Sequence, residues 1–360
     1  MYKKLLILIF SLLNLFCSAI TYAREINVVF LNPGHPSDNA TGKFWSNVTR
    51  FMEAASNDLD INLVTIYAYR NHVLMKSLTQ QVIEQKPDYV ILVNEKGIAL
   101  NIFKEIAAHE IPVFMLLNTL SSDEYDLLSQ DEKNLLIGSL TPDNYRVGRK
   151  LGDDLIKTYV QQSRHDSSNN TIKILALQGD HTTPAAIARA KGFTDSLKIH
   201  KNINLIDSTV ANWSKQQAYQ KVKGMLQRDR IDIIWTANDA MAFGAKQAVL
   251  EAKLIHQPII GGINWDVSDE GYAIDISYGG HVTLGAYAIT MLKDIDDKVM
   301  SDIEKYQMID IFESSRSNHF PLFKTLLINK ELSRYDFTHF NENSDAKMRF
   351  SIANLIQTLN

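Results

Sequence analysis

Residues 232–244 read DIIWTANDAMAFG, and this stretch decides the fold class. Its first half is a short run of β-branched and aromatic residues, which favours a buried strand. Its second half is typical of a helix, and Asp239 stands where the N-cap of a helix beginning at Ala240 would stand. A strand that leads directly into a helix is the building unit of α/β folds.

The same strand-then-helix order recurs along the chain on both sides of this stretch. The other apolar runs are Ile26–Leu31, Ile61–Tyr67, Asp88–Val93, Ile111–Leu117, Leu135–Gly138, Lys173–Leu177, Ile203–Val210, Pro258–Ile263 and Tyr272–Tyr278. Continuous apolar strands that alternate with helices indicate parallel sheets covered on both faces. We therefore predict an α/β protein with two Rossmann-like lobes, joined by a multi-strand hinge, with a ligand cleft between the lobes.

The lobe boundaries follow from where the pattern restarts. We expect the first lobe to comprise residues 24–118 and about 279–300. The second lobe is expected to comprise residues 119–278 and about 301–360, with the last part as a C-terminal elaboration. Trp235 lies inside an apolar run, so a core position is expected for it.

The N-terminus has the features of a secretory signal peptide. Lys3 and Lys4 precede an apolar run that ends near Ile20, and a small residue, Ala23, offers a cleavage site. We expect residues 1–23 to be removed on export to the periplasm of a Gram-negative-type bacterium. Cys17, the only cysteine, lies in this segment, so the mature chain would have no disulfide and no thiol chemistry.

Composition and motifs argue against several classes of function. The formal net charge is −4 and no long basic run occurs, which makes nucleic acid a poor candidate partner. The nucleophile and phosphate-binding motifs of common enzymes are missing, so we expect no catalytic residues and no cofactor. Asp266, Asp269 and Glu270 lack the spacing of a calcium loop and are interpreted as solvated carboxylates, which leaves no predicted metal site.

Polar planar side chains and aromatic residues follow most of the predicted strands. In open parallel sheets, ligands bind at the carboxyl ends of the strands. Amide, carboxylate and guanidinium groups there can hydrogen-bond hydroxyl groups, while aromatic faces cover the C–H surface of a sugar. This composition favours a small polar, polyhydroxylated ligand.

Two motifs give the chain a resemblance to a known family. Residues 189–193 read RAKGF, and residues 238–244 read NDAMAFG. With the aromatic pair Phe44 and Trp45, they make the chain resemble the type I periplasmic binding proteins of the ribose-binding-like group, which includes the autoinducer-2 receptor. The resemblance covers about residues 26–300.

The resemblance implies roles for individual residues. Arg189 and either Asn238 or Asp239 would hydrogen-bond the ligand, and Phe44 or Trp45 would stack on it. The chain departs from the sugar-binding pattern at Asn264, where an acidic residue is common, and at Gly279, where a glutamine is usual. Plain ribose is therefore not the expected ligand.

These considerations give one set of predicted ligand contacts and a hinge. The predicted contacts are Phe44, Trp45, Asn94, Asn118, Arg189, Trp213, Asn238, Asp239, Asn264, Tyr278 and His281. Gly279 and Gly280 are the predicted hinge, because glycine permits the backbone rotations of lobe closure. Two simpler roles stay open: His281 as a helix-start or packing residue, and Arg189 as the partner of a surface carboxylate.

The predicted function is that of a monomeric periplasmic solute-binding protein. Its lobes would close on a sugar-like or furanosyl ligand and present it to an ABC-type importer, because a ligand that contacts both lobes favours the closed state. One alternative is a sensor that signals to a membrane kinase or a cyclic-nucleotide enzyme. A LacI-like transcriptional regulator is a remote alternative, disfavoured by the signal peptide in place of a DNA-binding domain.

Overall fold

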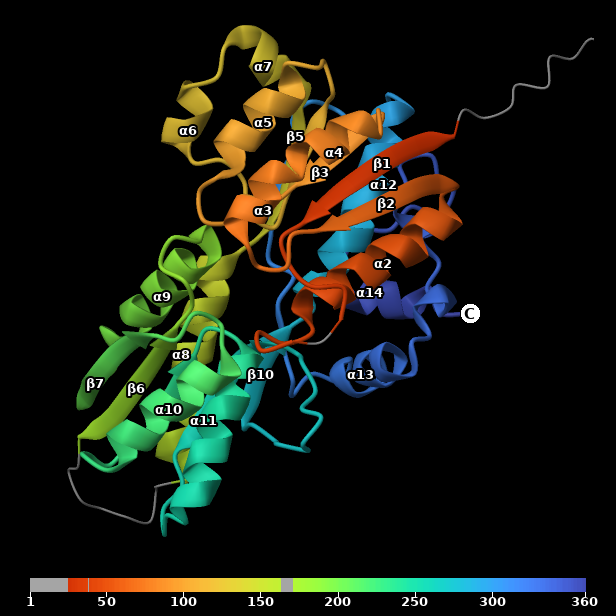
Figure 1. Cartoon of the computed structure of the whole chain (residues 1–360). Coiled ribbons are helices and arrows are strands. Elements are labelled where there is room, and N and C mark those ends of the chain that lie inside the picture. The colour runs from red at the N-terminus through yellow and green to blue at the C-terminus, as the bar shows by residue number, and fades with distance from the viewer. Residues whose placement is uncertain (1–24, 38, 163–170) are drawn as a thin grey trace, which may run out of the picture.

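The computed structural model describes residues 25–37, 39–162 and 171–360. The predicted signal peptide, residues 1–23, lies outside them. The described chain forms two α/β lobes, each built around a six-stranded sheet, as Figure 1 shows. The predicted fold class is confirmed.

The sheet of the first lobe is entirely parallel and has the order β11-β5-β4-β3-β1-β2. Its central strands are buried, as their continuous apolar sequences require. The strands are β1 (Ile26–Asn32), β2 (Ile61–Tyr67), β3 (Tyr89–Leu92), β4 (Val113–Leu116), β5 (Leu136–Pro142) and β11 (Tyr306–Ile309).

The sheet of the second lobe has the order β12-β10-β9-β8-β6-β7, and only the edge strand β12 is antiparallel to its neighbour. Its core includes Trp235, which is fully buried and stacks on Phe193 at 4.6 Å, as predicted for a core residue. The strands are β6 (Ile172–Gln178), β7 (Ile203–Val210), β8 (Ile233–Thr236), β9 (Ile259–Asn264), β10 (Ile276–Gly279) and β12 (Glu313–Ser314).

Helices follow the strands in both lobes. The first lobe carries α2 (Phe44–Asp58), α3 (His72–Ser77), α4 (Thr79–Glu84), α5 (Ala99–Ala107), α6 (Ser122–Asp126), α7 (Gln130–Leu135) and α12 (Leu284–Asp296), and the second carries α8 (Asn144–Gln162), α9 (Pro184–Leu197), α10 (Lys215–Leu226) and α11 (Asp239–Ala252). The short helix η1 (His281–Thr283) leads from β10 into α12.

The boundary placed after residue 118 was wrong. The strand over residues 136–142, β5, pairs with β4 and therefore belongs to the first sheet. The chain enters the second lobe only after Pro142, where α8 begins and packs against α9, β9 and β10. A parallel strand that fills the next place in a sheet looks the same in sequence as the first strand of a new sheet, so periodicity alone could not place it.

The assignment of residues 301–360 to the second lobe was also wrong. β11 pairs with β5 in the first sheet, and only β12 joins the second. The elements that follow are α13 (Phe320–Asn329), η2 (Leu332–Arg334), η3 (Phe337–Phe340) and α14 (Ile352–Gln357). η2 and η3 contact α2, and η3 also contacts α12. Figure 1 shows α14 beside α2, and the Phe337 backbone N–H donates to Asp58 of α2 at 2.9 Å. The segment covers an apolar face of α2, where the buried Phe51 ring contacts Phe323 and Tyr335.

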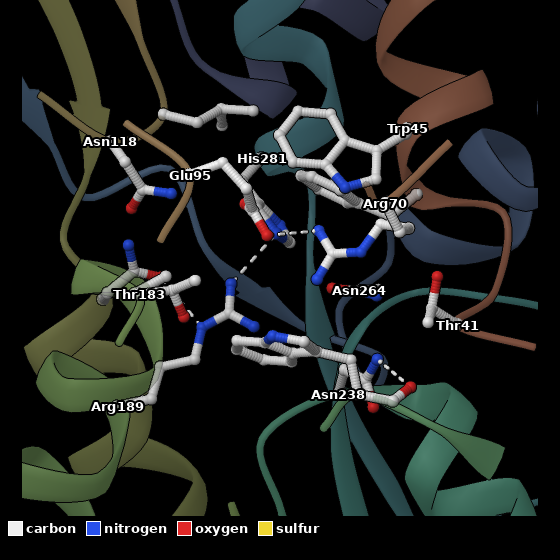
Figure 2. A pocket seen from close by; sticks show the side chains of 15 residues that line it. Thr41, Trp45, Arg70, Glu95, Asn118, Thr183, Arg189, Asn238, Asn264 and His281 are labelled. Atoms are coloured by element: carbon white, nitrogen blue, oxygen red, sulfur yellow. Dashed lines mark hydrogen bonds and ion pairs between the residues drawn. The ribbon is translucent and has the colours of Figure 1, made fainter. Parts of the chain in front are cut away.

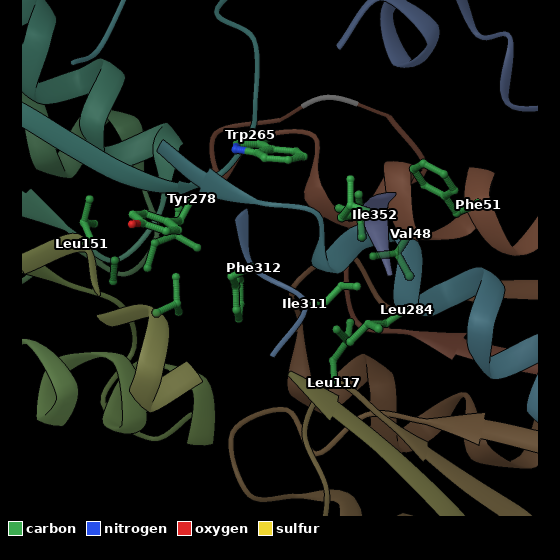
Figure 3. Packing of buried hydrophobic residues seen from close by; sticks show 14 of the residues in the cluster. Val48, Phe51, Leu117, Leu151, Trp265, Tyr278, Leu284, Ile311, Phe312 and Ile352 are labelled. Atoms are coloured by element: carbon green, nitrogen blue, oxygen red, sulfur yellow. The ribbon is translucent and has the colours of Figure 1, made fainter. Parts of the chain in front are cut away.

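The chain crosses between the lobes after β5, after β10 and between β11 and β12. Gly279 is the last residue of β10, and Gly280 has a φ of +102°, which favours glycine. Figure 3 shows the apolar side chains around these crossings, among them Trp265, Tyr278, Ile311, Phe312 and Ile352. The predicted hinge glycines therefore lie at one crossing, next to a packed apolar core.

Candidate functional site

A cavity lies between the lobes, at the carboxyl ends of the strands of both sheets. Its empty volume is about 590 Å³, which includes space that is open to solvent. Figure 2 shows side chains from both lobes converging on it. They are Thr41, Phe44, Trp45, Arg70, Glu95, Leu117, Asn118, Asn144, Thr183, Ala185, Arg189, Trp213, Asn238, Asn264 and His281.

Most of the predicted contacts are brought together here. The ones that line the cavity are Phe44, Trp45, Asn118, Arg189, Trp213, Asn238, Asn264 and His281. Their common property is position: each follows a strand end or begins a helix. The placement agrees with the prediction, and ligand binding by these residues stays a prediction.

Asn94 and Tyr278 do not line the cavity, and for these two residues the predicted placement was wrong. The Asn94 amide donates to Glu124 at 3.0 Å and to the Thr119 carbonyl at 3.2 Å, so it holds the start of α6. The Tyr278 hydroxyl donates to Asp154 of α8 at 2.6 Å. Both side chains point into their own lobes.

Asp239 was wrongly placed in the cavity and at the N-cap. Asn238 is the N-cap of α11, accepting a hydrogen bond from the Met241 N–H at 3.0 Å, and Asp239 is the first helical residue. The buried Asp239 carboxylate accepts from the Ser277 hydroxyl at 2.7 Å and from the Asp266 N–H at 2.9 Å. Burial and the neighbouring Asp266 raise its pKa well above the ordinary value. Asp239 therefore braces the loop behind Asn264 and does not line the cavity.

Arg189 is the most constrained cation of the cavity. It is only 4% exposed, and it donates to the Ala237 carbonyl at 2.7 Å and to the Asn144 amide oxygen at 2.8 Å. Burial lowers its pKa to about 9, so it stays protonated at neutral pH. The alternative that it pairs with a surface carboxylate is wrong, because both partners are neutral groups inside the protein.

His281 stands at the crossing between the lobes and packs between aromatic rings. Phe44 stacks on one face at 4.8 Å, and Phe312 lies at 4.5 Å. Burial and the charge of Arg189 lower its pKa well below the ordinary value, so the ring is neutral. Its Nε2 lies 3.1 Å from Arg189 Nη2 and must accept there, which places the proton on Nδ1. His281 thus has a packing role as well as a place in the cavity wall.

Arg70 and Glu95 form an ion pair on the first-lobe side of the cavity, drawn as a dashed line in Figure 2. Arg70 Nη1 lies 2.7 Å from Glu95 Oε1, and Glu95 is 5% exposed. Burial raises the pKa of Glu95 and the Arg70 charge opposes that rise. Neither residue was among the predicted contacts. Arg70 follows β2, so a search of every strand end would have found it.

Five further residues that line the cavity were not among the predicted contacts. Asn144 begins α8 just after β5, the strand that was placed in the wrong lobe. Thr183 precedes α9 and donates its hydroxyl to the Asp180 carbonyl at 2.8 Å. The remaining ones are Thr41, Leu117 and Ala185. Small and apolar residues of this kind carry no signal in a single sequence.

Two glycines seat the indole rings that line the cavity. A Cβ added at Gly34 would lie 2.2 Å from the Trp45 side chain, and one at Gly179 would lie 2.3 Å from Trp213. Any larger residue at either position would displace the ring. The Trp213 ring also faces the Arg189 guanidinium, 5.8 Å from its centroid. The aromatic walls are thus set by backbone contacts of their own lobes.

Unusual backbone conformations cluster around the cavity. Positive φ angles occur at Arg70 (59°), Leu117 (65°), Trp213 (63°) and Asn264 (150°). Such conformations cost free energy in residues other than glycine and occur often at functional sites. They direct these side chains toward the cavity.

The lobes also touch at the rim of the cleft. Lys96 Nζ of the first lobe lies 3.2 Å from Asp180 Oδ2 of the second, and Lys43 Nζ lies 2.5 Å from Asp269. The Lys215 N–H donates to the Ala40 carbonyl at 3.1 Å. The two lobes are therefore in direct contact at the rim of the cleft.

The interpretation of the acidic loop after β9 as solvated carboxylates was wrong, because Asp269 pairs with Lys43 of the other lobe and Glu270 pairs with Lys215. Asp266 accepts a hydrogen bond from the Asn264 amide at 3.2 Å.

Two further kinds of feature are missing from the described residues. No described helix combines the length and the apolar character needed to cross a membrane. In the same ranges, no three His, Cys, Asp or Glu side chains come together as a metal site would require.

Solved structures share this architecture, and curated proteins are similar to part of the sequence. A periplasmic sugar-binding protein from Pseudomonas fluorescens superposes with a TM-score of 0.78 at 26% identity, and the match covers 92% of this chain and 99% of that chain. The galactofuranose-binding protein YtfQ of Escherichia coli (strain K12) is 27% identical over 157 residues, 42% of this chain and 44% of its own. The D-allose-binding periplasmic protein of the same organism is 30% identical over 114 residues, 31% of this chain and 34% of its own. The chain thus matches less than half the length of these curated relatives.

A family model described as the periplasmic binding protein domain matches residues 36–273, well over half of the chain. The matched range contains every cavity residue except His281. With two mainly parallel sheets, three crossings between them and a cavity at the strand ends, the chain belongs to the periplasmic binding protein family.

Proposed function

We propose that this protein is a periplasmic receptor that closes on a monosaccharide-sized, polyhydroxylated ligand and presents it to an ABC-type importer. One observation carries the proposal: a cavity between two lobes combines aromatic walls with amide, carboxylate and guanidinium groups. Relatives named for galactofuranose, fructose and D-allose support a carbohydrate as the ligand class.

The chemistry of the wall suits a sugar. Trp45 and Trp213 offer flat faces for C–H surfaces. The side-chain amide of Asn118 has no hydrogen-bond partner among the described residues, so it can donate to and accept from hydroxyl groups. Glu95, held by Arg70, adds a carboxylate that accepts from hydroxyl groups.

The proposal includes no chemical step. The hydroxyl groups on the cavity wall belong to Thr41 and Thr183, and Thr183 donates to a backbone carbonyl. His281 is neutral and accepts from Arg189, so it is not placed to activate either of them. The ligand would leave the site unchanged.

A ligand screen tests the proposal. Pentoses, hexoses, polyols and amino acids are titrated while protein fluorescence and the melting temperature are followed. We expect a carbohydrate to raise the melting temperature, because ligand at 100 times its Kd stabilises the native state by about 2.7 kcal/mol. Trp213→Ala should weaken that binding at least about tenfold. Trp235→Phe, a change in the core of the same lobe, should leave the affinity unchanged.

The opposite results would be equally clear. Stabilisation by amino acids and by none of the carbohydrates would contradict the proposed ligand class. Equal affinities of the wild type and Trp213→Ala for a bound sugar would place the binding site elsewhere.

A further inference from the structure

The charges on the cavity wall do not balance. The wall holds two guanidinium groups, Arg70 and Arg189, and one carboxylate, Glu95. Arg70 and Glu95 lie 2.7 Å apart and neutralise each other. His281 is neutral, so Arg189 is left as an excess positive charge.

Arg189 has hydrogen-bond partners and no counter-charge. Its contacts are the Ala237 carbonyl at 2.7 Å, the Asn144 amide oxygen at 2.8 Å and His281 Nε2 at 3.1 Å, all neutral acceptors. No carboxylate of the described residues forms an ion pair with it. A side chain that is 4% exposed and charged is normally paired, because an unpaired buried charge costs several kcal/mol. These contacts use three of its five N–H donors and leave two.

Asp239, the carboxylate whose charge acts on Arg189, does not form an ion pair with it. Asp239 acts on Arg189 only through its field, since its oxygens are taken by Ser277 and by the Asp266 N–H.

Other features of the wall add to the positive potential. The helices α2, α8, α9 and α11 all begin at the cavity, and their first turns contribute Phe44, Trp45, Asn144 and Ala185, with Asn238 as the α11 N-cap. Each helix N-terminus carries about half a positive charge. His281 Nδ1, which bears the ring proton, is buried and has no partner among the described residues.

We infer that the natural ligand is an anionic carbohydrate, whose carboxylate or phosphate group is bound by Arg189. This inference rests on the proposed function and narrows its ligand class. A guanidinium offers two parallel donors that match the geometry of either anion. The sugar part would meet the aromatic walls and the amides.

Matched series of ligands test the inference. The purified protein is titrated with D-galactose, D-galacturonate and galactose 1-phosphate, with D-glucose, D-glucuronate and glucose 6-phosphate, and with D-ribose, D-ribonate and ribose 5-phosphate. In at least one series, an anionic member should bind at least about tenfold more tightly than its neutral parent. Its affinity should fall as salt rises, since the contact is between charges. The acid and phosphate arms distinguish the two anions.

Two variants and a control tie the preference to Arg189. Arg189→Gln should bring the ratio of anionic to neutral affinity to about one, and Arg189→Lys, which keeps the charge, should retain a preference with weaker binding. Lys191→Gln removes an exposed cation from the same helix, paired with Asp195 at 2.8 Å, and should leave the ratio unchanged.

Each remaining outcome decides against the inference. If neutral sugars bind as tightly as or more tightly than their anionic counterparts in every series that binds, the inference is overturned while the proposed function stands. If no carbohydrate of either kind binds, both are overturned. If Arg189→Gln still prefers the anionic sugar over its neutral parent, the assignment of Arg189 as the group that binds the anion would also be overturned.

Discussion

Asp294 is the buried carboxylate outside the site whose surroundings most clearly affect pH stability. It lies on α12, is 1% exposed, and accepts a hydrogen bond from the Glu342 N–H of the C-terminal segment at 2.9 Å. Burial raises its pKa to about 6. The folded state therefore binds a proton here more tightly than the unfolded chain, whose Asp has a pKa near 3.9.

The consequence is a stability that falls as pH rises. Below about pH 4 the carboxyl is protonated in both states and costs nothing. Between about pH 4 and 6 the unfolded state loses the proton first, so the free energy of unfolding drops, and it stays lower above pH 6. Asp294→Asn keeps an acceptor for Glu342 without the charge. We expect it to raise the free energy of unfolding by about 1–3 kcal/mol at pH 7.5 and by little at pH 4, measured by urea titration.

Asp297→Asn is the matched control for this prediction. Asp297 follows the last residue of the same helix, is exposed, and pairs with Lys293 at 2.5 Å. Its charge adds only a minor part to the raised pKa of Asp294, so removing it should give a much smaller gain at pH 7.5 than Asp294→Asn. A gain for Asp294→Asn of equal size at pH 4 and pH 7.5 would contradict the titration argument.

The polar residues of the site could be predicted where a residue's place at a strand end or helix start determines that its side chain faces the cavity. Arg189, Asn238 and Asn264 follow this rule and line the cavity. Tyr278 does not, because neighbouring residues of a strand point to opposite faces and the sequence leaves open which face meets the cleft. The ion pair of Arg70 with Glu95 depends on two loops meeting in space, which a single sequence does not reveal.

Helix α13 packs against both lobes. Phe323 is 1% exposed and packs on Phe51 of α2 at 5.7 Å and on Trp265, which follows β9, at 5.2 Å. Arg50 of α2 donates to the Leu327 carbonyl at 3.1 Å. The helix thus contacts both lobes beside the crossings.

Truncation of Phe323 should therefore be costly. Phe323→Ala removes a ring from a buried contact between two lobes, and we expect a loss of about 3–5 kcal/mol in the free energy of unfolding. The unfolding of the two lobes should also become less cooperative, with fluorescence and circular dichroism transitions that no longer coincide. Leu322→Ala, at a position on the same helix that is 40% exposed, should cost less than about 1 kcal/mol. Similar losses for both variants would show that α13 does not join the lobes.

The positions of the strands along the sequence were predicted more reliably than the sheet to which each strand belongs. Apolar runs mark β1, β6 and β9 within one residue of their ends, because a strand buried on both faces needs a continuous apolar sequence. The place of β5 and the path of residues 301–360 depend on long-range pairing, for which local pattern carries no information. The predicted lobe boundaries were therefore wrong at β5 and at residues 301–360.

At the scale of the whole molecule, binding and closure are one equilibrium. Contacts at the rim favour the closed state whether or not a ligand is bound, so they add to the apparent affinity by raising the closed fraction. Lys96 and Asp180 form such a contact from opposite lobes, 3.2 Å apart and partly shielded from solvent. Their attraction should contribute about 0.2–1 kcal/mol, as partly exposed ion pairs do.

Asp180→Asn tests this coupling. Asn can still accept from the Thr182 N–H, which Asp180 binds at 3.0 Å, so the loop before α9 should keep its shape. We expect a Kd two- to fivefold higher at low salt, mainly through faster ligand dissociation, and no difference from the wild type near 1 M salt, where the Debye length is about 3 Å. Asp302→Asn breaks a more exposed ion pair away from the cleft, that of Asp302 with Lys305 at 2.8 Å, and should leave the Kd unchanged. A salt-independent loss of affinity in Asp180→Asn would instead assign its effect to the shape of the cavity wall, because screening removes an ionic contribution and leaves a structural one.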